Sequence, residues 1–490
     1  MGSNTIMKDP NIIFIMADDM GYGDLSCYGA TKIQTPNMDR AAAEGVRFTD
    51  AHSSSAVCTP SRYSVLTGRY CWRTARKRGV GGGFSLPLID PSRLTVASLL
   101  KEHGYATAAV GKWHVGLGWQ VKDEYDNKGG IAHEENFRFG HGLGMTSIPS
   151  GKTFDPEIWE DTDAIDYAKP IIGGPRTLGF DYFFGITGSL DMPPYCFIEN
   201  DRTVGIPNVE KSPYNTQQKR GYMTAGWKDE EVDSHFARKA VDFIENHVND
   251  SPEQPFFLYL TPSAPHRPCM PPQFMAGKSQ AGPRGDMVMM MDWVVGQVLE
   301  TLDRLKIGDN TLLIITSDNG ARPADIDGDT YGHKSCGDLR GYKADIWDGG
   351  HREPFLARWP EFFCLSDLTA TCAAIVGGDL PHNAAEDSVN MLPALLDEPR
   401  EAPLREAIVH HSVDGMFSIR QDCWKLILGL GSGGFSEPKR VIPTPDEPQG
   451  QLYNLEKDFA ETTNLWNEHP EVVERLTALL KQYQQTGRSR

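Results

Sequence analysis

A cysteine opens the segment 58–62 (CTPSR), whose residue types suit nucleophilic chemistry. Its proline favours the first turn of a helix, so we expect a helix over Ser61–Gly68 that leaves Cys58 close to the helix amino terminus. There the backbone N–H groups and the helix dipole stabilise an anion or lower the pKa of a thiol. Arg62, one turn further on, is placed to clamp an anion. The residues alone leave two interpretations open: Cys58 is a thiolate nucleophile, or an inert cysteine ahead of a helix.

Acidic side chains are grouped at two points far apart in the chain, in the pairs Asp18-Asp19 and Asp318-Asn319. Brought together, they would put three carboxylates and one amide oxygen in one place. That arrangement is costly unless a hard cation with oxygen ligands compensates the charge. We therefore expect a calcium ion, with magnesium as the alternative. The competing interpretation is two surface loops that never meet.

Basic side chains that suit a tetrahedral oxyanion lie in three further segments. Lys112 and His114 alternate, so in an extended chain both face the same way. His266 lies in a proline-rich turn, and Lys343 and Arg352 flank an Asp-Gly-Gly sequence. Each of them alone is more often structural or solvated. Together they suit the stabilisation of developing negative charge and of a leaving group.

The elements that must position these side chains are short buried strands. Apolar runs predict strands of an α/β sheet over Ile12–Ala17, Tyr105–Val110, Phe256–Leu260 and Leu312–Thr316. Each run is followed by one of the polar groups above, and open α/β sheets bind ligands at the carboxyl ends of their strands. We therefore expect the groups to share one crevice. Helices are expected over 235–247 and from Asp286, as the helix cap, to Leu305.

The chain changes character near residue 385. We expect an α/β catalytic domain over 1–385 and a small antiparallel α+β subdomain over 386–490. Within the first, residues 115–230 are expected to run over the sheet, where substrate contacts usually lie. The elements expected in the second are strands over Ala407–His411, Met416–Arg420 and Trp424–Leu428, and a terminal helix over Glu471–Tyr483.

The composition excludes several classes of protein. The net charge of −18 argues against a nucleic-acid partner. It does not exclude an anionic substrate, since charges beyond about 8 Å are screened. No apolar run is long enough to span a bilayer. The nine cysteines form no Cys-x-x-Cys pair, which indicates neither a zinc cluster nor a disulfide framework.

Taken in order, the motifs resemble the type I, formylglycine-dependent sulfatase family of the alkaline phosphatase superfamily. Each motif alone is weak, but the combination is highly specific and spans residues 11–354. The resemblance implies a large mixed sheet sandwiched by helices. The motifs are ADD (17–19), CTPSR (58–62), LTGR (66–69), GKWH (111–114), APH (264–266), SDNG (317–320) and GGHREP (349–354).

The resemblance also implies a chemistry for Cys58. A formylglycine-generating enzyme would convert this cysteine to formylglycine (3-oxoalanine), which Arg62 would orient. One hydroxyl of the hydrated aldehyde would attack sulfur, and the second would be deprotonated to expel sulfate. The calcium ligands implied are Asp18, Asp19, residue 58, Asp318 and Asn319.

The basic residues acquire roles in the same way. The resemblance implies that Lys112, Lys343 and His266 grip the sulfate oxygens. Either His266 or Lys343 would protonate the leaving group, and His114 would be the base of the elimination step. The assignment of Lys343 is the least secure, because His333 and Lys334 lie nearby and compete for substrate binding.

The sequence says least about the substrate. The context of residue 58 and the loop Trp72–Leu88 resemble bacterial carbohydrate sulfatases, which favours a sulfated poly- or oligosaccharide such as an algal galactan or a glycosaminoglycan. The basic residues Arg73, Arg76, Lys77 and Arg78 form either a solvated loop or a site for further anionic groups, with Arg78 as the candidate contact. Such enzymes are secreted or periplasmic; the segment 11–17 does not read as a signal peptide, and we expect the leader to be absent from this sequence, with the cytoplasm as the alternative.

Three other functions compete with a sulfatase. A phosphonate monoester or phosphodiester hydrolase would use the same formylglycine. A catalytically silent glycan-binding protein would keep the fold but does not need a modifiable cysteine and an acidic cage. A cysteine hydrolase that pairs unmodified Cys58 with His114 or His266 leaves the cage unexplained.

Overall fold

A large mixed sheet forms the centre of the protein. The computed structural model describes residues 9–123, 164–215, 218–322, 331–358, 365–395 and 403–490. Within them the strand order is β2-β11-β10-β1-β9-β3-β4-β5-β6, parallel from β10 to β4 and antiparallel at both edges. The strands are β1 (Asn11–Ala17), β2 (Val46–His52), β3 (Ala106–Lys112), β4 (Tyr182–Ile186), β5 (Ile198–Glu199), β6 (Arg202–Thr203), β9 (Phe256–Thr261), β10 (Thr311–Ser317) and β11 (Arg352–Arg358).

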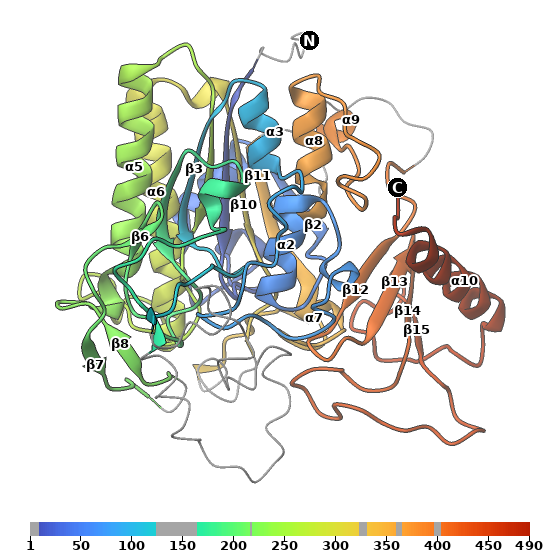
Figure 1. The fold of residues 1–490 in the computed structure, drawn as a ribbon. Helices are drawn as coiled ribbons and strands as arrows, with labels where there is room; N and C mark the ends of the chain where they lie inside the picture. Colours follow the sequence, from blue (N-terminus) through green and yellow to red (C-terminus); the bar gives the residue numbers. More distant parts are fainter. Residues whose placement is uncertain (1–8, 124–163, 216–217, 323–330, 359–364, 396–402) are drawn as a thin grey trace.

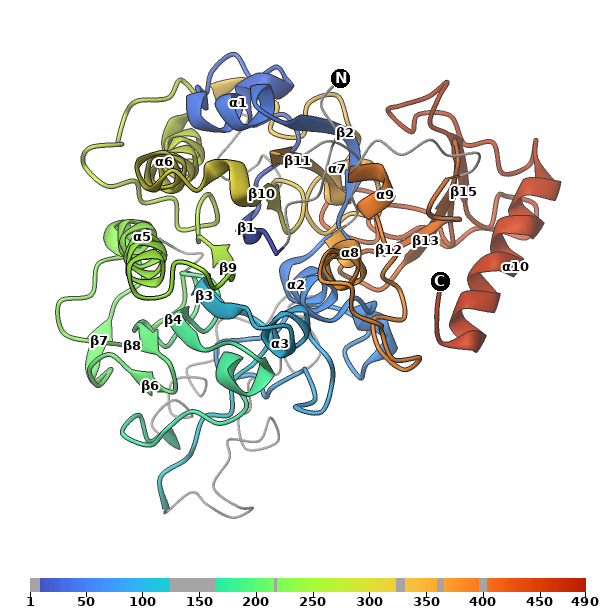
Figure 2. The same cartoon turned by 90° about the horizontal axis from the view of Figure 1, so that it is seen from above.

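Helices cover both faces of this sheet (Figure 1). The alternation of side chains along β1 sends Ile12 and Phe14 into one apolar core and Ile13 and Ile15 into the other. Viewed from above, the two helix layers lie on opposite sides of the strands (Figure 2). The first core includes α2 (Cys58–Thr67), α3 (Val96–Glu102) and α8 (Leu368–Ile375); the second includes α1 (Pro36–Ala43), α5 (Val232–Asp250) and α6 (Gly282–Leu305).

A second, antiparallel sheet follows in the C-terminal part of the chain. Its strands run in the order β12-β13-β14-β15, and α10 (Pro470–Thr486) packs Leu476 and Leu480 against Val409 and Leu426. Figure 1 shows this unit beside the β2 edge of the large sheet. Its strands are β12 (Ile408–His411), β13 (Phe417–Gln421), β14 (Trp424–Ile427) and β15 (Gln451–Asn454). The described residues also contain the hairpin β7 (Val209–Lys211) and β8 (Gly221–Met223) and the short helices α7 (Asp348–His351) and α9 (Leu392–Leu395).

The predicted elements compare well with these bounds. All four predicted strands of the large sheet are confirmed, as are the three C-terminal strands and the terminal helix. The domain boundary at 385 stays a prediction, and residues 124–163 and 216–217 of the predicted excursion lie outside the described residues. No helix in the described ranges is both long and apolar enough to cross a membrane.

The prediction that Asp286 caps its helix is wrong. Helix α6 begins four residues earlier, at Gly282, because Pro283 lies in its first turn. The carboxylate of Asp286 instead accepts hydrogen bonds from the N–H groups of Gly277 and Ser279, both at 2.7 Å. It therefore closes the turn that precedes the helix.

Candidate active site

The two acidic pairs meet because β1 and β10 are parallel neighbours in register, with Ala17 opposite Ser317. The N–H of Asp19 donates to Asp318 Oδ1 at 3.2 Å, and Asn319 Nδ2 donates to Asp19 Oδ1 at 2.8 Å. All four side chains of the two pairs are buried. The alternative of two surface loops that never meet is therefore wrong.

These side chains present oxygen atoms that fit a metal ion. Among the residues that the structure describes, Asp18 Oδ1, Asp19 Oδ2 and Asn319 Oδ1 are buried and take part in no hydrogen bond. Ligand atoms of Asp18, Asp318 and Cys58 lie within 4.8 Å of one another. Buried carboxylate oxygens without a donor are costly, and a hard cation with oxygen ligands removes that cost. The side chains of Asp18, Asp19, Asp318 and Asn319 thus form an oxygen cage that suits calcium or magnesium beside residue 58.

Cys58 begins helix α2 and is almost fully buried. The helix ends at Thr67, and Gly68 follows in the left-handed conformation (φ 62°). Burial raises the pKa of the Cys58 thiol, although Lys112 and Lys343 act in the opposite direction. Of the two interpretations of Cys58, the thiolate nucleophile is therefore wrong, because desolvation outweighs the attraction of Lys112 and Lys343 for a thiolate. An unmodified Cys58 is a neutral thiol in this site.

The Arg62 guanidinium is buried and contacts the cage residue Asp318. Its Nε and Nη2 atoms lie 2.9 and 2.7 Å from Asp318 Oδ2, and its Nη1 donates to the backbone oxygen of Lys112 at 2.9 Å. The guanidinium thus ties α2 to the ends of β10 and β3. It fixes residue 58, one helical turn away, relative to the acidic pairs.

Three of the predicted cations lie directly on the cage. Lys112 Nζ donates to Asp18 Oδ2 at 2.7 Å, Lys343 Nζ donates to Asp19 Oδ1, and His266 Nε2 lies 3.5 Å from Asp19 Oδ2. Burial alone would lower the pKa of Lys343, but Asp19 raises it above the usual value. Burial lowers the pKa of His266 to about 3, against the pull of Asp19. Lys343 is therefore charged, whereas His266 is neutral until further negative charge approaches.

His114 is fixed by a clamp that the sequence did not reveal. Its Nε2 donates to the backbone oxygen of Gly81 at 2.8 Å, which leaves Nδ1 as the unprotonated nitrogen. Thr59 holds both ends of this contact: its hydroxyl donates to the backbone oxygen of His114 at 2.9 Å and accepts from the N–H of Gly81 at 3.0 Å. Burial and the nearby Lys112 keep the pKa of His114 well below its usual value. The side chain is thus a neutral, oriented base.

The other three predicted substrate contacts lie elsewhere. His333 Nε2 lies 2.9 Å from Asp24 Oδ1, and Lys334 is exposed and pairs with Asp338 at 2.9 Å. Of the two lysines that compete for the sulfate-binding role, Lys334 is exposed to solvent, whereas Lys343 donates to Asp19 of the cage. Arg78 is exposed; its neighbours in the basic loop are engaged, Arg73 with Asp387, Arg76 with the oxygen of Val80 and Lys77 with that of Trp72.

A buried ion pair between Arg284 and Asp24 contacts the backbone of the cage residue Asp19. Arg284 donates to both oxygens of Asp24, at 2.9 and 2.6 Å, and its Nη2 donates to the backbone oxygen of Asp19 at 2.8 Å. This pair therefore fixes the loop that follows β1. The sequence did not reveal this pair, because neither residue directly follows a predicted strand or belongs to one of the motifs, and the two are 260 positions apart.

Replacing Asp24 by asparagine is expected to lower the free energy of unfolding by about 3–5 kcal/mol, since it leaves the Arg284 guanidinium buried without its charge partner. Burial raises the pKa of Asp24, but Arg284 outweighs it and lowers the pKa from 3.8 to about 2. The difference between wild type and variant should thus be constant above pH 4 and shrink as pH falls from about 4 to about 2. Urea unfolding measures it; Asp338→Asn, at an exposed ion pair, should change stability by less than about 1 kcal/mol. An equal loss in both variants would contradict this account.

The turn that carries His266 is held by Asp233, at the start of α5. The Asp233 carboxylate accepts from the N–H of Ser263 at 2.7 Å and from its hydroxyl at 3.0 Å. The backbone N–H of His266 donates to the backbone oxygen of Ser263 at 3.0 Å. The backbone N–H of Asp18 donates to the backbone oxygen of Ala264 at 3.1 Å. The Asp233 carboxylate thus positions both Asp18 of the cage and His266.

Replacing Asp233 by asparagine is expected to lower kcat about 10–100-fold, because an amide has one acceptor oxygen and cannot serve both Ser263 groups. The thermal midpoint should fall by only a few degrees. Steady-state rates of sulfate release measure the effect. The matched control is Asp242→Asn, an exposed residue of the same helix. Equal rates in the two variants would show that the turn holds its shape without Asp233.

This combination of a mixed α/β sheet, an oxygen cage and cations around a helix-terminal cysteine defines a hydrolase for a tetrahedral oxyanion ester. A model of the sulfatase family matches residues 10–363. The chain is similar to the N-acetylgalactosamine-6-O-sulfatase of Bacteroides thetaiotaomicron, with 36% identity over 97% of this chain and 93% of that protein. Human steryl-sulfatase is 30% identical over 82% of this chain and 72% of its own length.

A solved structure from work on the metabolism of multiple glycosaminoglycans by Bacteroides thetaiotaomicron shares 34% identity and a TM-score of 0.78, over 97% of this chain and 99% of that one. The chain therefore belongs to the sulfatase family, as its motifs indicated. It is an enzyme that hydrolyses sulfate esters.

Proposed function

We propose that the protein removes sulfate from a sulfated oligo- or polysaccharide, with a formylglycine at position 58 and a calcium ion in the oxygen cage. The observation that carries this proposal is that, within the described chain, buried oxygens of Asp18, Asp19 and Asn319 beside residue 58 take part in no hydrogen bond. A formylglycine-generating enzyme would be the partner that supplies the aldehyde. Magnesium is the alternative ion.

The proposed substrate is a 6-O-sulfated N-acetylhexosamine of a glycosaminoglycan fragment. Support comes from the similar N-acetylgalactosamine-6-O-sulfatase, which aligns along nearly the whole chain. Steryl-sulfatase aligns over a smaller share at lower identity, which favours a sugar over a steroid. The similar solved structure comes from work on glycosaminoglycan metabolism, in agreement with this choice.

The bound ion would acidify a coordinated hydroxyl and offset negative charge on the sulfate. The formylglycine hydrate would supply the hydroxyl that attacks sulfur. The chain's own residues prepare these events. Arg62 fixes the helix that carries residue 58, through its contacts with Asp318. Lys112 and Lys343 donate to the cage residues Asp18 and Asp19, and the same two ammonium groups would bind the sulfate oxygens next to the cage.

His266 and His114 divide the proton transfers between them. A bound sulfate adds negative charge next to His266, which favours its protonated form and makes it the acid for the leaving alcohol. Lys343 suits this role less, because its pKa is raised. His114, neutral with Nδ1 unprotonated, would take the proton that accompanies sulfate expulsion. Thr59 would keep that nitrogen in place.

The structure disfavours a cysteine hydrolase. Burial keeps the Cys58 thiol protonated, and a thiol nucleophile needs its thiolate form. A cysteine hydrolase also leaves the oxygen cage without a task. A phosphonate or phosphodiester hydrolase would use the same oxygen cage and cations, and a comparison of sulfate with phosphate esters separates it from a sulfatase. A silent glycan-binding protein is disfavoured because the chain belongs to the sulfatase family.

Sulfate release from defined saccharides tests the proposal. Converted protein should hydrolyse N-acetylgalactosamine 6-sulfate at least about tenfold faster, by kcat/KM, than the 4-sulfate isomer or an aryl sulfate. The matched 6-phosphate ester should be a poorer substrate still. Faster hydrolysis of the phosphate would support a phosphoesterase. Saccharide binding without sulfate release by fully converted protein would support the binding protein.

A further inference from the structure

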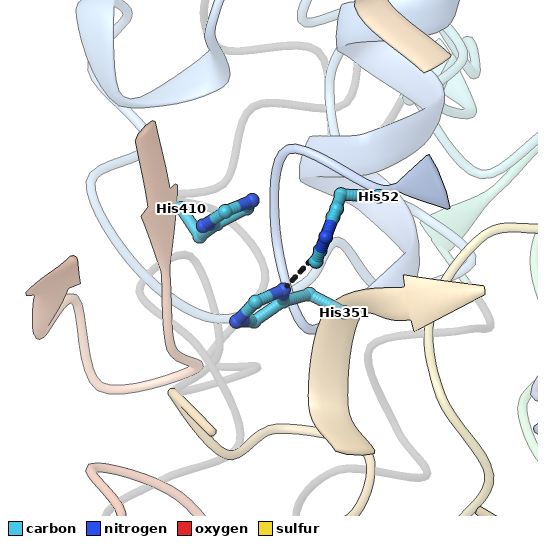
Figure 3. A group of neighbouring side chains, drawn as sticks. All are labelled: His52, His351 and His410. Atoms are coloured by element: carbon cyan, nitrogen blue, oxygen red, sulfur yellow. Dashed lines mark hydrogen bonds between the residues drawn. The ribbon is translucent and has the colours of Figure 1, made fainter. Parts of the chain in front are cut away.

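Three buried histidines meet where the large sheet adjoins the C-terminal sheet, away from the oxygen cage. His52 ends β2, His351 ends α7 and His410 lies in β12, so each comes from a different element (Figure 3). One ring nitrogen from each lies within 4.8 Å of the other two. All three side chains are at most 4% exposed. The mechanism above uses none of them.

The outer nitrogens of two of these rings face acceptors. His52 Nε2 lies 3.0 Å from Asp50 Oδ1, and His351 Nε2 lies 3.0 Å from the backbone oxygen of Ile346. Each Nε2 also faces a cationic donor, Arg420 Nη1 for His52 and Lys425 Nζ for His351, so two tautomer arrangements satisfy these contacts. In one of them both Nδ1 atoms carry a lone pair. The two Nδ1 atoms lie 3.1 Å apart, joined by the dashed line in Figure 3. Either one ring donates its Nδ1 proton to the other across this contact, or a metal ion binds both lone pairs.

The environment of the His410 ring favours a metal ion over a proton shared by the other two rings. In the described part of the chain His410 Nε2 is buried and takes part in no hydrogen bond, an arrangement that a proton shared by the other two rings does not relieve. The His410 ring lies parallel to that of His351, with centroids 3.9 Å apart. A rotation of this side chain, at the cost of a 3.4 Å contact with Ser418 Oγ, is needed to turn Nε2 toward a common ion.

Charged groups surround the cluster in nearly equal numbers. Lys425 Nζ lies 2.7 Å from Asp348 Oδ1 and 2.9 Å from Glu461 Oε1, and also 3.2 Å from His351 Nε2. On the other side, Arg420 pairs with Asp50 at 2.7 Å and lies 3.0 Å from His52 Nε2. Because these carboxylates are paired with Lys425 and Arg420, the three imidazoles are the groups that would bind an ion. The alternative without an ion is a hydrogen-bond chain from Lys425 through His351 to His52 and Asp50.

We propose that His52, His351 and His410 bind a divalent transition metal of the zinc class, which fastens the C-terminal sheet to the large sheet. Neutral imidazoles select such ions over calcium, and three of them leave one tetrahedral position for water. The site is structural. It is separate from the oxygen cage in both ligand chemistry and position, and it does not depend on the proposed substrate.

Metal binding by the full-length protein tests this site. After removal of bound metals, wild type should take up one zinc ion per chain, with a rise in thermal midpoint. Cobalt in its place should give the visible absorption of tetrahedral nitrogen ligation. His410→Ala should weaken zinc binding by about 100-fold or more. The matched control, His411→Ala, removes the neighbouring buried histidine of the same strand and should bind zinc as wild type does.

Two further measurements separate zinc binding by the histidines from zinc binding in the oxygen cage and from a folding defect. Asp18→Asn alters the oxygen cage and should leave the cobalt spectrum unchanged, which excludes zinc bound in the cage. The wild-type cobalt spectrum requires no variant, so it tests the site even if His410→Ala folds poorly. Absence of a nitrogen-ligated cobalt spectrum in wild type, or equal zinc affinity in His410→Ala and His411→Ala, would overturn the proposal in favour of the hydrogen-bond chain.

Discussion

Replacing Cys58 by alanine is expected to lower kcat for sulfate release by about 10⁴-fold or more, because the change removes the nucleophile and not a binding contact. The fold should survive, since the substitution removes one sulfur atom from a buried helix start and leaves the ion pair between Arg62 and Asp318 intact. Initial rates of sulfate release from a 6-O-sulfated saccharide measure the effect.

The control for this variant is retained structure and retained ligand binding. Its thermal midpoint should lie within a few degrees of wild type, and it should still bind the sulfated saccharide. Sulfate release within tenfold of wild type by a well-folded Cys58→Ala protein would mean that residue 58 carries no covalent chemistry. The oxygen cage alone would then have to activate water.

Replacing Asp18 by asparagine is expected to lower kcat by about 10³-fold, the equivalent of several kcal/mol of charge stabilisation by a metal ion. Asp18 presents one oxygen that takes part in no hydrogen bond within the described residues, and its other oxygen pairs with Lys112 at 2.7 Å. An amide keeps the size of the side chain but loses its charge, so both the ion and the lysine lose a partner. Calcium titrations should show a weaker apparent affinity.

Chelation supplies the matching result in unaltered protein. Removal of divalent ions by a chelator should abolish sulfate release from wild type, and added calcium should restore it, with magnesium as the weaker substitute. Asp309→Asn, an exposed residue ahead of β10, serves as the control and should behave as wild type does. Full activity in the presence of chelator, or unchanged calcium dependence in Asp18→Asn, would contradict the assignment of the cage.

The sequence predicted the part of the site that depends on strand ends. Asp18, Lys112, His266 and Asp318 each follow or end an apolar run that forms a strand of the large sheet. Parallel neighbours bring their carboxyl ends to one edge, so local patterns sufficed to group residues that are up to 300 positions apart. The other strands of the large sheet, β2, β4, β5, β6 and β11, were missed. Strand β2 (VRFTDAH), for example, has no continuous apolar run, so its pattern gave no signal.

The parts that escaped prediction depend on contacts between segments without a common pattern. Thr59 fixes His114 through the loop at Gly81, and Asp233 fixes Ser263 from another helix. Neither pair has a spacing that reveals it. The sequence left open whether Cys58 is a thiolate or an inert thiol, because a helix position is visible in sequence, whereas the depth of burial that raises the pKa of Cys58 is not. The three-histidine cluster escaped for the same reason.

The most direct test of the central claim relates sulfate release to the state of residue 58. Mass spectrometry of the tryptic peptide 48–62 distinguishes cysteine from formylglycine, since a CHO group replaces CH2–SH. Preparations with different degrees of conversion should release sulfate in proportion to the aldehyde fraction, with a line that passes through zero. A preparation in which residue 58 is entirely cysteine, yet which hydrolyses the sulfate ester as fast as converted protein, would contradict the account.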